Sequence, residues 1–178
     1  MNLMPGFAGR FFIFFVVCWF GGCYCFFMAK TLGYMITWTT YGTWLQGDEK
    51  GWVKDGEVLK KNEQLRRDNE QRLIKDAVRL SANEKKTVET AIRKEAKKND
   101  ITLEALAVCS NHVHVVVGYC EQSIEEVVGR FKNAGRVALK NAGIVSKGRI
   151  WTKGYDKRFC YDEDALKNRI GYVNKHDD

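Results

Sequence analysis

Proline is almost absent from this sequence, with one occurrence in 178 residues. Hydrophobic residues make up 45% of the chain and aromatic residues 12%, and this composition argues against an intrinsically disordered protein. The length is that of about one ordinary domain and is enough to bury a real core. Internal repeats and low-complexity linkers are also missing from the sequence. We therefore expect residues 28–178 to form one domain.

The expected domain lacks cysteine pairs with the spacing of a structural zinc site. Its three cysteines, Cys109, Cys120 and Cys160, are widely separated, and none belongs to a C-x-x-C pair. We interpret them as buried or half-buried thiols in a reducing compartment. The other cysteines of the chain are Cys18, Cys23 and Cys25, which precede the expected domain.

Charge is missing from one stretch near the N-terminus, which reads "FFIFFVVCWFGGCYCFFM" from Phe11 to Met28. As a helix it would be about 27 Å long, just enough for a bilayer core. A signal peptide, a membrane anchor and a reading frame started too early are the three interpretations, and no A-x-A-like cleavage site follows the run. We favour the early start, because "MAKTLGYMITW" from Met28 is typical of a bacterial N-terminus leading into a strand. A membrane anchor is second, and a folded role in solution for residues 1–27 is not expected.

The charge balance of the whole chain is basic. Lysine and arginine together number 29 against 22 aspartates and glutamates, so the net charge is 29 − 22 = +7, and the isoelectric point is about 9.1. A basic chain favours a polyanionic partner such as nucleic acid.

Hydrophobic patterning predicts the elements of the first half of the domain. A strand is expected at residues 34–40, followed by an irregular loop that carries Trp44 and Trp52. Residues 54–80 are densely charged, which indicates helix and loop on the surface. Ser81 and Glu84 have the spacing of a capping box, so we expect one amphipathic helix from there to Asn99 and Asp100.

The second half predicts the fold class. Strands are expected at residues 101–109 and 110–118, and Ser123 with Glu126 starts a helix that ends near Gly143. A fourth strand is expected either around residues 150–152 or around 158–161, and Asp162 would cap a last helix. The order β-α-β-β-α-β-α predicts an α+β fold: a ferredoxin-like split βαβ with an antiparallel sheet and an added C-terminal helix that carries a tyrosine.

Histidine is scarce, and two of the three histidines lie in the short run "SNHVHVVVG", residues 110–118. Strict alternation predicts a strand in which Val113, Val115 and Val117 face the core. His112 and His114 would then share the opposite face. Taken alone, an H-x-H strand is more often surface or hydrogen-bonded histidine than a metal ligand.

The last helix carries the third histidine. Ala165, Arg169, Tyr172 and His176 fall on one helical face, and Leu166, Ile170 and Val173 form the neighbouring apolar face. If this helix packs over the sheet face that bears the other two histidines, three imidazoles and one phenol meet. Three neutral imidazoles suit a divalent cation with open positions, and a tyrosine beside it is a credible nucleophile. Tyr172 alone would more often be a packed aromatic.

These residues resemble a known family. "NHVHVVV" is similar to the His-hydrophobic-His motif of the HUH nucleases, which are single-strand DNA transposases and relaxases. With it, "WTTYGTWLQGDEKGWV", "ALAVCSNHVHVVVG", "FKNAGRVALKNAG" and "NRIGYVNKH" resemble the REP-associated tyrosine transposases. The resemblance covers most of residues 33–178.

The resemblance implies roles for particular residues. His112 and His114 match the paired metal ligands, Tyr172 matches the catalytic tyrosine, and His176 matches a further ligand position that the family fills with Gln, Asn or His. By analogy the ion is Mg²⁺ or Mn²⁺. The implied reaction is nicking and strand transfer of single-stranded DNA through a 5′-phosphotyrosine at sites flanked by hairpins. The implied location is the bacterial cytoplasm, in association with the nucleoid.

DNA recognition is assigned on weaker grounds. Four basic residues of the second long helix are candidates for backbone contacts: Arg130, Lys132, Arg136 and Lys140. Trp38, Trp44 and Trp52 are candidates for base stacking, although Trp38 belongs to a strand pattern and is better explained as core. A catalytically inactive hairpin-binding derivative and a membrane-anchored metal-binding protein are the alternatives, and a homodimer is left open.

Overall fold

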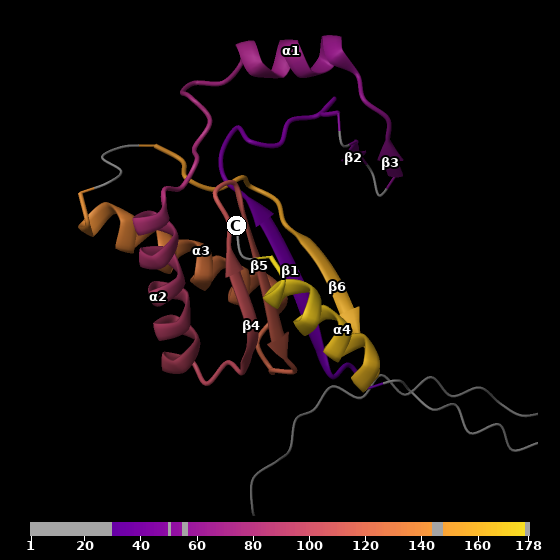
Figure 1. Ribbon diagram of the computed structural model, residues 1–178, viewed down its shortest axis with the longest axis vertical. Helices are drawn as coiled ribbons and strands as arrows, with labels where there is room; N and C mark the ends of the chain where they lie inside the picture. Colours follow the sequence, from indigo (N-terminus) through magenta and orange to yellow (C-terminus); the bar gives the residue numbers. More distant parts are fainter. Residues whose placement is uncertain (1–29, 50, 55–56, 144–147, 177–178) are drawn as a thin grey trace, which may run out of the picture.

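A computed structural model describes residues 30–49, 51–54, 57–143 and 148–176 (Figure 1). The expectations for residues 1–27, including the membrane anchor, lie outside the described residues. Ten elements follow one another along the chain: β1 (Gly33–Thr39), β2 (Trp52–Lys54), β3 (Glu57–Leu59), α1 (Glu63–Gln71), α2 (Ala82–Lys98), β4 (Leu103–Val108), β5 (His112–Gly118), α3 (Ile124–Asn141), β6 (Asp156–Cys160) and α4 (Glu163–Asn174).

The main sheet confirms the expected fold class. Its four strands are ordered β4-β5-β1-β6, and every neighbouring pair is antiparallel. Counted among these four strands, the order is second, third, first, fourth, which is that of a ferredoxin-like split βαβ unit. The fourth strand is the later of the two predicted segments, whereas Trp151 makes only an isolated bridge with Thr40.

Both faces of this sheet are covered by helices. On one face Val113, Val115 and Val117 pack in a core shared with α2 and α3, which contribute residues such as Ile92 and Phe131. On the other face Val116 packs with Met35, Ala105 and Ala107 against Val173 of α4. This second apolar layer explains why Val116 is as buried as its neighbours, although simple alternation would turn it toward solvent.

Two helices begin as the capping-box spacing predicts. The carboxylate of Glu84 accepts a hydrogen bond from the Ser81 backbone N–H at 2.6 Å. Glu126 does the same for Ser123 at 3.0 Å, and the Ser123 hydroxyl accepts from the Glu126 N–H at 3.2 Å. These bonds satisfy backbone donors that a helix start would leave unpaired.

The region between β1 and α2 departs in part from the expectation. Helix α1 lies inside the charged segment as predicted, but Trp52 belongs to a two-stranded sheet, β2–β3, and not to an irregular loop. The hairpin forms a sheet of its own, apart from the main sheet. Because each of its strands has three residues, the sequence has no long apolar alternation from which a strand would be predicted.

Candidate metal and tyrosine centre

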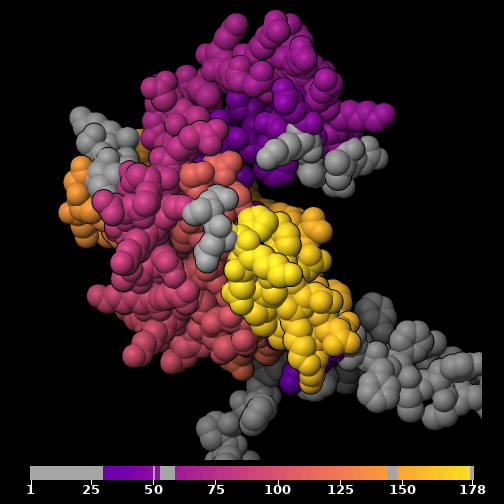
Figure 2. Space-filling model, viewed as in Figure 1, coloured from indigo at the N-terminus to yellow at the C-terminus, as the bar shows by residue number. Residues whose placement is uncertain are grey.

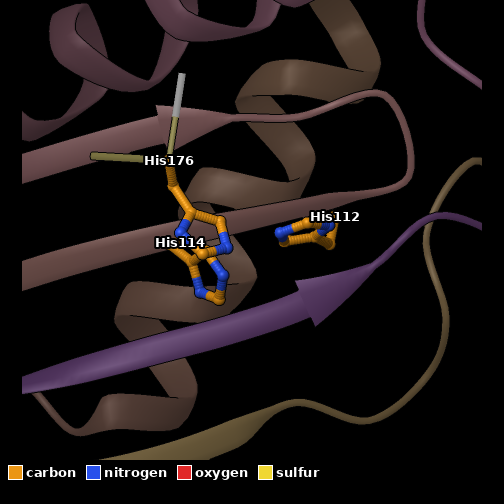
Figure 3. A group of neighbouring side chains, drawn as sticks. All are labelled: His112, His114 and His176. Atoms are coloured by element: carbon orange, nitrogen blue, oxygen red, sulfur yellow. The ribbon is translucent and has the colours of Figure 1, made fainter. Parts of the chain in front are cut away.

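Strand β5 supplies the first two candidate ligands. His112 and His114 lie on the sheet face opposite Val113 and Val115, as the alternation predicts, and their ring centroids are 4.6 Å apart (Figure 3). His114 is buried, with 6% of its surface exposed, while His112 is half-buried at the start of the strand. The two rings are therefore neighbours on a rigid central strand and not side chains of a mobile loop.

Hydrogen bonds orient both imidazoles. Nδ1 of His112 lies 2.7 Å from Oδ1 of Asn111, and because an amide oxygen only accepts, Nδ1 carries the proton. Nδ1 of His114 lies 2.7 Å from the hydroxyl of Thr37, its register partner on β1. The lone pair of His112 is thus on Nε2, and Nε2 of His114 is the ring nitrogen not engaged by Thr37. Such partners fix the tautomer and ring orientation of metal-binding histidines.

Helix α4 supplies the third imidazole and the phenol. The carboxylate of Asp162 caps its start by accepting from the Ala165 N–H at 2.7 Å. The apolar face packs on the sheet through Val173, with Leu166 and Ile170 beside it. Figure 2 shows α4, in yellow, lying directly against the body of the molecule. This docking sets Tyr172 and His176 over the two strand histidines.

The four side chains converge as the sequence predicts. The ring centroid of His176 lies 4.8 Å from that of His114 and 5.7 Å from that of His112. The ring centroid of Tyr172 lies 5.5 Å from that of His114. One ligand nitrogen from each histidine can be chosen so that all three lie within 4.8 Å of one another. Adjacent nitrogens bound to one ion at about 2.1 Å lie about 3.0–3.4 Å apart in octahedral or tetrahedral geometry. A pair of nitrogens as wide as 4.8 Å must therefore close by about 1.4–1.8 Å, a movement on the scale of a side-chain rotation.

The chemistry of this donor set fits a divalent cation. Burial, reinforced by the neighbouring imidazoles of His112 and His176, lowers the pKa of His114 to about 4. His114 is therefore neutral at pH 7, which is the form that binds a metal. Three imidazoles leave coordination positions for other ligands, which is the arrangement expected of a catalytic and not a structural ion.

Tyr172 and His176 also contact each other. The Tyr172 hydroxyl is 3.5 Å from Nε2 of His176, and 44% of the tyrosine surface is exposed. The ring is packed against imidazoles on one side and reaches solvent on the other. A hydroxyl in this position is accessible to a macromolecular substrate.

The predicted DNA-contacting residues lie away from this centre. They sit on α3, which packs on the sheet face opposite α4. Arg130, Arg136 and Lys140 are exposed there. Lys132 is half-buried, and its ammonium donates to the carbonyls of Thr152 at 3.1 Å and Gly154 at 2.8 Å. Burial lowers the pKa of Lys132 to about 8. Lys132 therefore anchors the segment before β6, and DNA contact by all four residues stays a prediction.

The three tryptophans have different environments. Trp38 is in the core with 1% of its surface exposed, in agreement with its strand pattern. Trp52 is half-buried on β2, where its indole N–H donates to the Lys60 carbonyl. Trp44 is 45% exposed and lines a pocket beside the candidate centre. Base stacking by Trp44 or Trp52 stays a prediction.

The sequence reasoning missed the residues that support the centre. Asn111 precedes His112 in the motif itself, and Thr37 faces His114 across the antiparallel register of β1 and β5. Asn111 could have been found from its position in the chain. Thr37 could not, because its role depends on which residue of β1 pairs with His114.

The fold agrees with the comparisons to known proteins. The family model "Transposase IS200 like" matches residues 74–176, more than half of the chain, so the chain belongs to the IS200-like transposase family. It is therefore a transposase, a DNA-binding and DNA-cleaving protein of DNA transposition. No curated protein matches the chain. Among the described residues, no helix has the length and apolar character needed to span a membrane.

Two solved structures are similar to this chain. A REP-associated tyrosine transposase bound to a REP hairpin has a TM-score of 0.50 and 11% sequence identity, over 88% of this chain and 70% of that one. A protein assigned as a transposase of Deinococcus radiodurans R1 has a TM-score of 0.43 and 17% identity, over 91% of this chain and 98% of that one. The first likeness supports the fold assigned above.

Proposed function

We propose that this transposase nicks and rejoins single-stranded DNA beside hairpins, with Tyr172 as the nucleophile and a divalent ion, Mg²⁺ or Mn²⁺, held by His112, His114 and His176. The convergence of these four side chains carries the proposal, because the ligand nitrogens lie within 4.8 Å of one another and the phenol lies against them. All four come from one chain, which supports cleavage by each chain on its own. A homodimer stays a prediction, as does action in the bacterial cytoplasm at the nucleoid.

The ion, when bound, supplies positive charge that polarises the scissile phosphate and stabilises the charge that develops on its oxygens. The remaining chemistry belongs to the protein. Oη of Tyr172 loses its proton and attacks phosphorus, forming a P–O bond to the tyrosine, while the bond from phosphorus to the 3′ oxygen breaks. That oxygen takes up a proton and leaves as a free 3′-OH.

The products explain how strands are joined. The cut strand stays attached to Tyr172 through its 5′ phosphate, so the energy of the phosphodiester is retained. A 3′-OH from another strand end can attack this phosphotyrosine and restore a phosphodiester, which releases the tyrosine. The reaction needs no nucleoside triphosphate.

Hairpin-bearing DNA is proposed as the substrate on two grounds. The sequence motifs resemble those of REP-associated tyrosine transposases, and the structural neighbour with that name is bound to a REP hairpin. The basic balance of the chain supports a nucleic-acid partner of some kind. The hairpin itself is the part of the proposal that depends most on these relatives.

The test is formation of a covalent protein–DNA adduct. The full chain is incubated with Mg²⁺ or Mn²⁺ and a pool of 3′-labelled single strands, each with a hairpin of randomised stem and flanks. Label that stays on the protein through a denaturing gel reports the phosphotyrosine. Tyr172→Phe removes the nucleophile and His112→Ala removes a ligand, so both should lose the adduct. Tyr119→Phe is the matched control, since Tyr119 is an exposed tyrosine just beyond β5.

The variants separate the proposal from its alternative. Adduct from the wild type and Tyr119→Phe, and none from Tyr172→Phe, supports the enzyme. Binding of hairpins without adduct from the wild type would indicate the inactive hairpin-binding derivative. Equal adduct from Tyr172→Phe and wild type would exclude Tyr172 as the nucleophile.

A further inference from the structure

A pocket of about 650 Å³ opens directly beside the candidate centre. His114 and Tyr172 form part of its lining, and Trp44, Tyr155, Arg158 and Arg169 form other parts. The two arginines, Tyr155 and Trp44 have no role in the metal and tyrosine chemistry described above. A volume of this size is in the range of pockets that hold a small organic ligand.

Two arginines from different elements give the pocket lining positive charge. Arg169 lies on α4 one turn before Tyr172, and Arg158 lies on the edge strand β6. Arg158 pairs with Asp156 at 3.1 Å, and Asp156 also lines the pocket, so the lining holds two guanidinium groups against one carboxylate. Guanidinium groups bind phosphate oxygens with two parallel hydrogen bonds, which makes the pocket suited to a phosphate ester.

An aromatic ring faces the same space and is held in place. The Trp44 indole N–H donates to the Gly51 carbonyl at 3.0 Å, although 45% of the residue is exposed. Its loop is tied to the start of α1 by the Asn62 N–H, which donates to the Gly47 carbonyl at 3.0 Å. Gly47 has a φ of +96° and packs so closely that a Cβ added there would meet the Asn62 carbonyl oxygen. An exposed indole that is already ordered loses little conformational freedom when a planar ligand stacks on it.

A second part of the lining is also ordered before any ligand binds. The Tyr155 hydroxyl donates to Glu125 of α3 at 2.5 Å, and Lys132 holds the carbonyls of Thr152 and Gly154. The segment between Trp151 and β6 is thereby tied to α3. The pocket is a preformed site bounded by an aromatic ring, two arginines and the tyrosine.

We propose that this pocket binds one unpaired nucleotide adjacent to the scissile phosphate, with its base stacked on Trp44 and a flanking phosphate bound by Arg158 and Arg169. This inference rests on the proposed function, because the pocket ligand is identified from the position of the pocket beside Tyr172, the proposed nucleophile. A base can stack on Trp44 only when neither a pairing partner nor a neighbouring base holds it inside a helix. The pocket therefore favours single-stranded DNA over duplex DNA. The adjacent phosphate would then be aligned with the tyrosine hydroxyl.

The test uses a probe that needs no cleavage. A five-nucleotide thymidine strand with 2-aminopurine at its centre fluoresces less when the modified base stacks on an aromatic ring. Full-length wild type and Tyr172→Phe should both quench it. Trp44→Ala should lose the quenching and bind about tenfold more weakly, and Trp44→Phe should recover part of both.

Matched substitutions control for charge and aromatic loss. Arg158→Gln and Arg169→Gln should each weaken binding about tenfold, whereas Arg93→Gln should not, although it also removes an arginine paired with one carboxylate. Tyr119→Ala removes an exposed aromatic residue that follows the end of β5 and is not part of the pocket lining, so it should leave quenching unchanged. Circular dichroism of every variant verifies that it is folded.

The outcomes keep the two proposals distinct. Quenching by wild type that is lost only in the pocket variants supports the nucleotide site, even if no adduct forms with hairpin DNA. Wild type that does not quench the probe, or Trp44→Ala that quenches as the wild type does, overturns the nucleotide site. Adduct formation through Tyr172 together with either of those results would leave the proposed function standing without this pocket.

Discussion

The imidazole of His176 has two candidate uses. One of its ring nitrogens belongs to the group that could hold the ion, and its Nε2 lies 3.5 Å from the Tyr172 hydroxyl, where a neutral ring could accept the phenolic proton. A neutral imidazole has one ring lone pair, so a ring bound to a cation cannot accept a proton at the same time. The proposed function uses His176 as a ligand, so its role as a base would contradict that part of the account.

Two substitutions distinguish these roles. His176→Gln keeps an oxygen or nitrogen near the ion but removes the imidazole base, and His176→Ala removes both. If His176 is a ligand, His176→Gln should form adduct within about tenfold of the wild-type rate, and His176→Ala should be slower by a further tenfold or more. The rate of adduct formation with saturating Mn²⁺ measures this. An equal reduction in both variants would indicate a base.

The residues of the centre could be predicted from two periodicities. The spacing i, i+2 put His112 and His114 on one face of a strand, and the spacing i, i+4 put Tyr172 and His176 on one face of a helix. Their approach to each other is a tertiary fact that neither spacing contains. It was predicted only on the condition that the helix packs over the sheet, which the structure satisfies.

At the scale of elements, the position of α4 decides whether the centre exists. Its apolar residues meet Val116 and the neighbouring strands, and only Val173 of the helix is fully buried. A short helix with so small a buried face depends on its cap for stability. The Asp162 carboxylate provides that cap.

Asp162→Ala should therefore affect the centre from a distance. Loss of the cap should lower the free energy of unfolding by about 1 kcal/mol. Because fraying of α4 moves His176 away from the strand histidines, the affinity for Mn²⁺ should also fall severalfold. Asp164→Ala is the control, since Asp164 is in the same first turn but makes no capping bond. Isothermal titration with Mn²⁺ and denaturant unfolding measure the two effects, and equal values for both variants would contradict this role of the cap.

Lys132 of α3 holds the segment before β6, and its titration should make the free energy of unfolding depend on pH. Burial lowers the pKa of Lys132 to about 8 from 10.5 in an exposed chain. Between these values the folded protein binds fewer protons than the unfolded chain, so stability rises as the pH increases through this window. The full shift corresponds to about 3 kcal/mol, and since the ammonium is only half-buried we expect about 1–2 kcal/mol.

The measurement is urea unfolding at several pH values between 7.5 and 10.5. The wild type should gain stability relative to Lys132→Met by about 1–2 kcal/mol across the range. Lys140→Met, on the same helix but exposed, is the comparison variant. A difference between wild type and Lys132→Met that does not grow with pH would show that Lys132 is not held as described.

The elements that the sequence predicted well are those with a long repeat of buried residues. The helices α2 and α3 and the strands of the main sheet are of this kind, and their capping boxes marked two of the starts. The β2–β3 hairpin was missed because its strands have three residues each and sit in a charged region. A period of two cannot be recognised over so few positions.

At the scale of the whole molecule, the candidate centre and the exposed basic residues of α3 lie on opposite sides of one sheet. The centre is under α4, and Arg130, Arg136 and Lys140 are on the helix that covers the other face. DNA that reaches both would have to pass around the sheet edge formed by β6 or β4. The pocket with Arg158 lies toward the β6 edge.

Salt dependence tests whether α3 takes part in DNA binding. Removing a side chain that binds one phosphate should reduce the slope of log affinity against log salt by about 0.7–0.9. We expect Arg130→Gln, Arg136→Gln and Lys140→Gln to do so with a labelled hairpin strand, and Arg93→Gln on α2 to leave the slope unchanged. If all four variants have the wild-type slope, DNA does not bind along α3.

The central claim is that Tyr172 is the residue that becomes joined to DNA, and mass spectrometry of the adduct tests it most directly. After reaction with Mn²⁺ and the hairpin pool, nuclease leaves a short nucleotide remnant and trypsin releases the peptide "IGYVNK", residues 170–175. The account predicts that this peptide carries the nucleotide phosphate on Tyr172 and that the modification disappears when the metal is chelated. A nucleotide on any other residue, or none on this peptide from protein that has cleaved DNA, would contradict it.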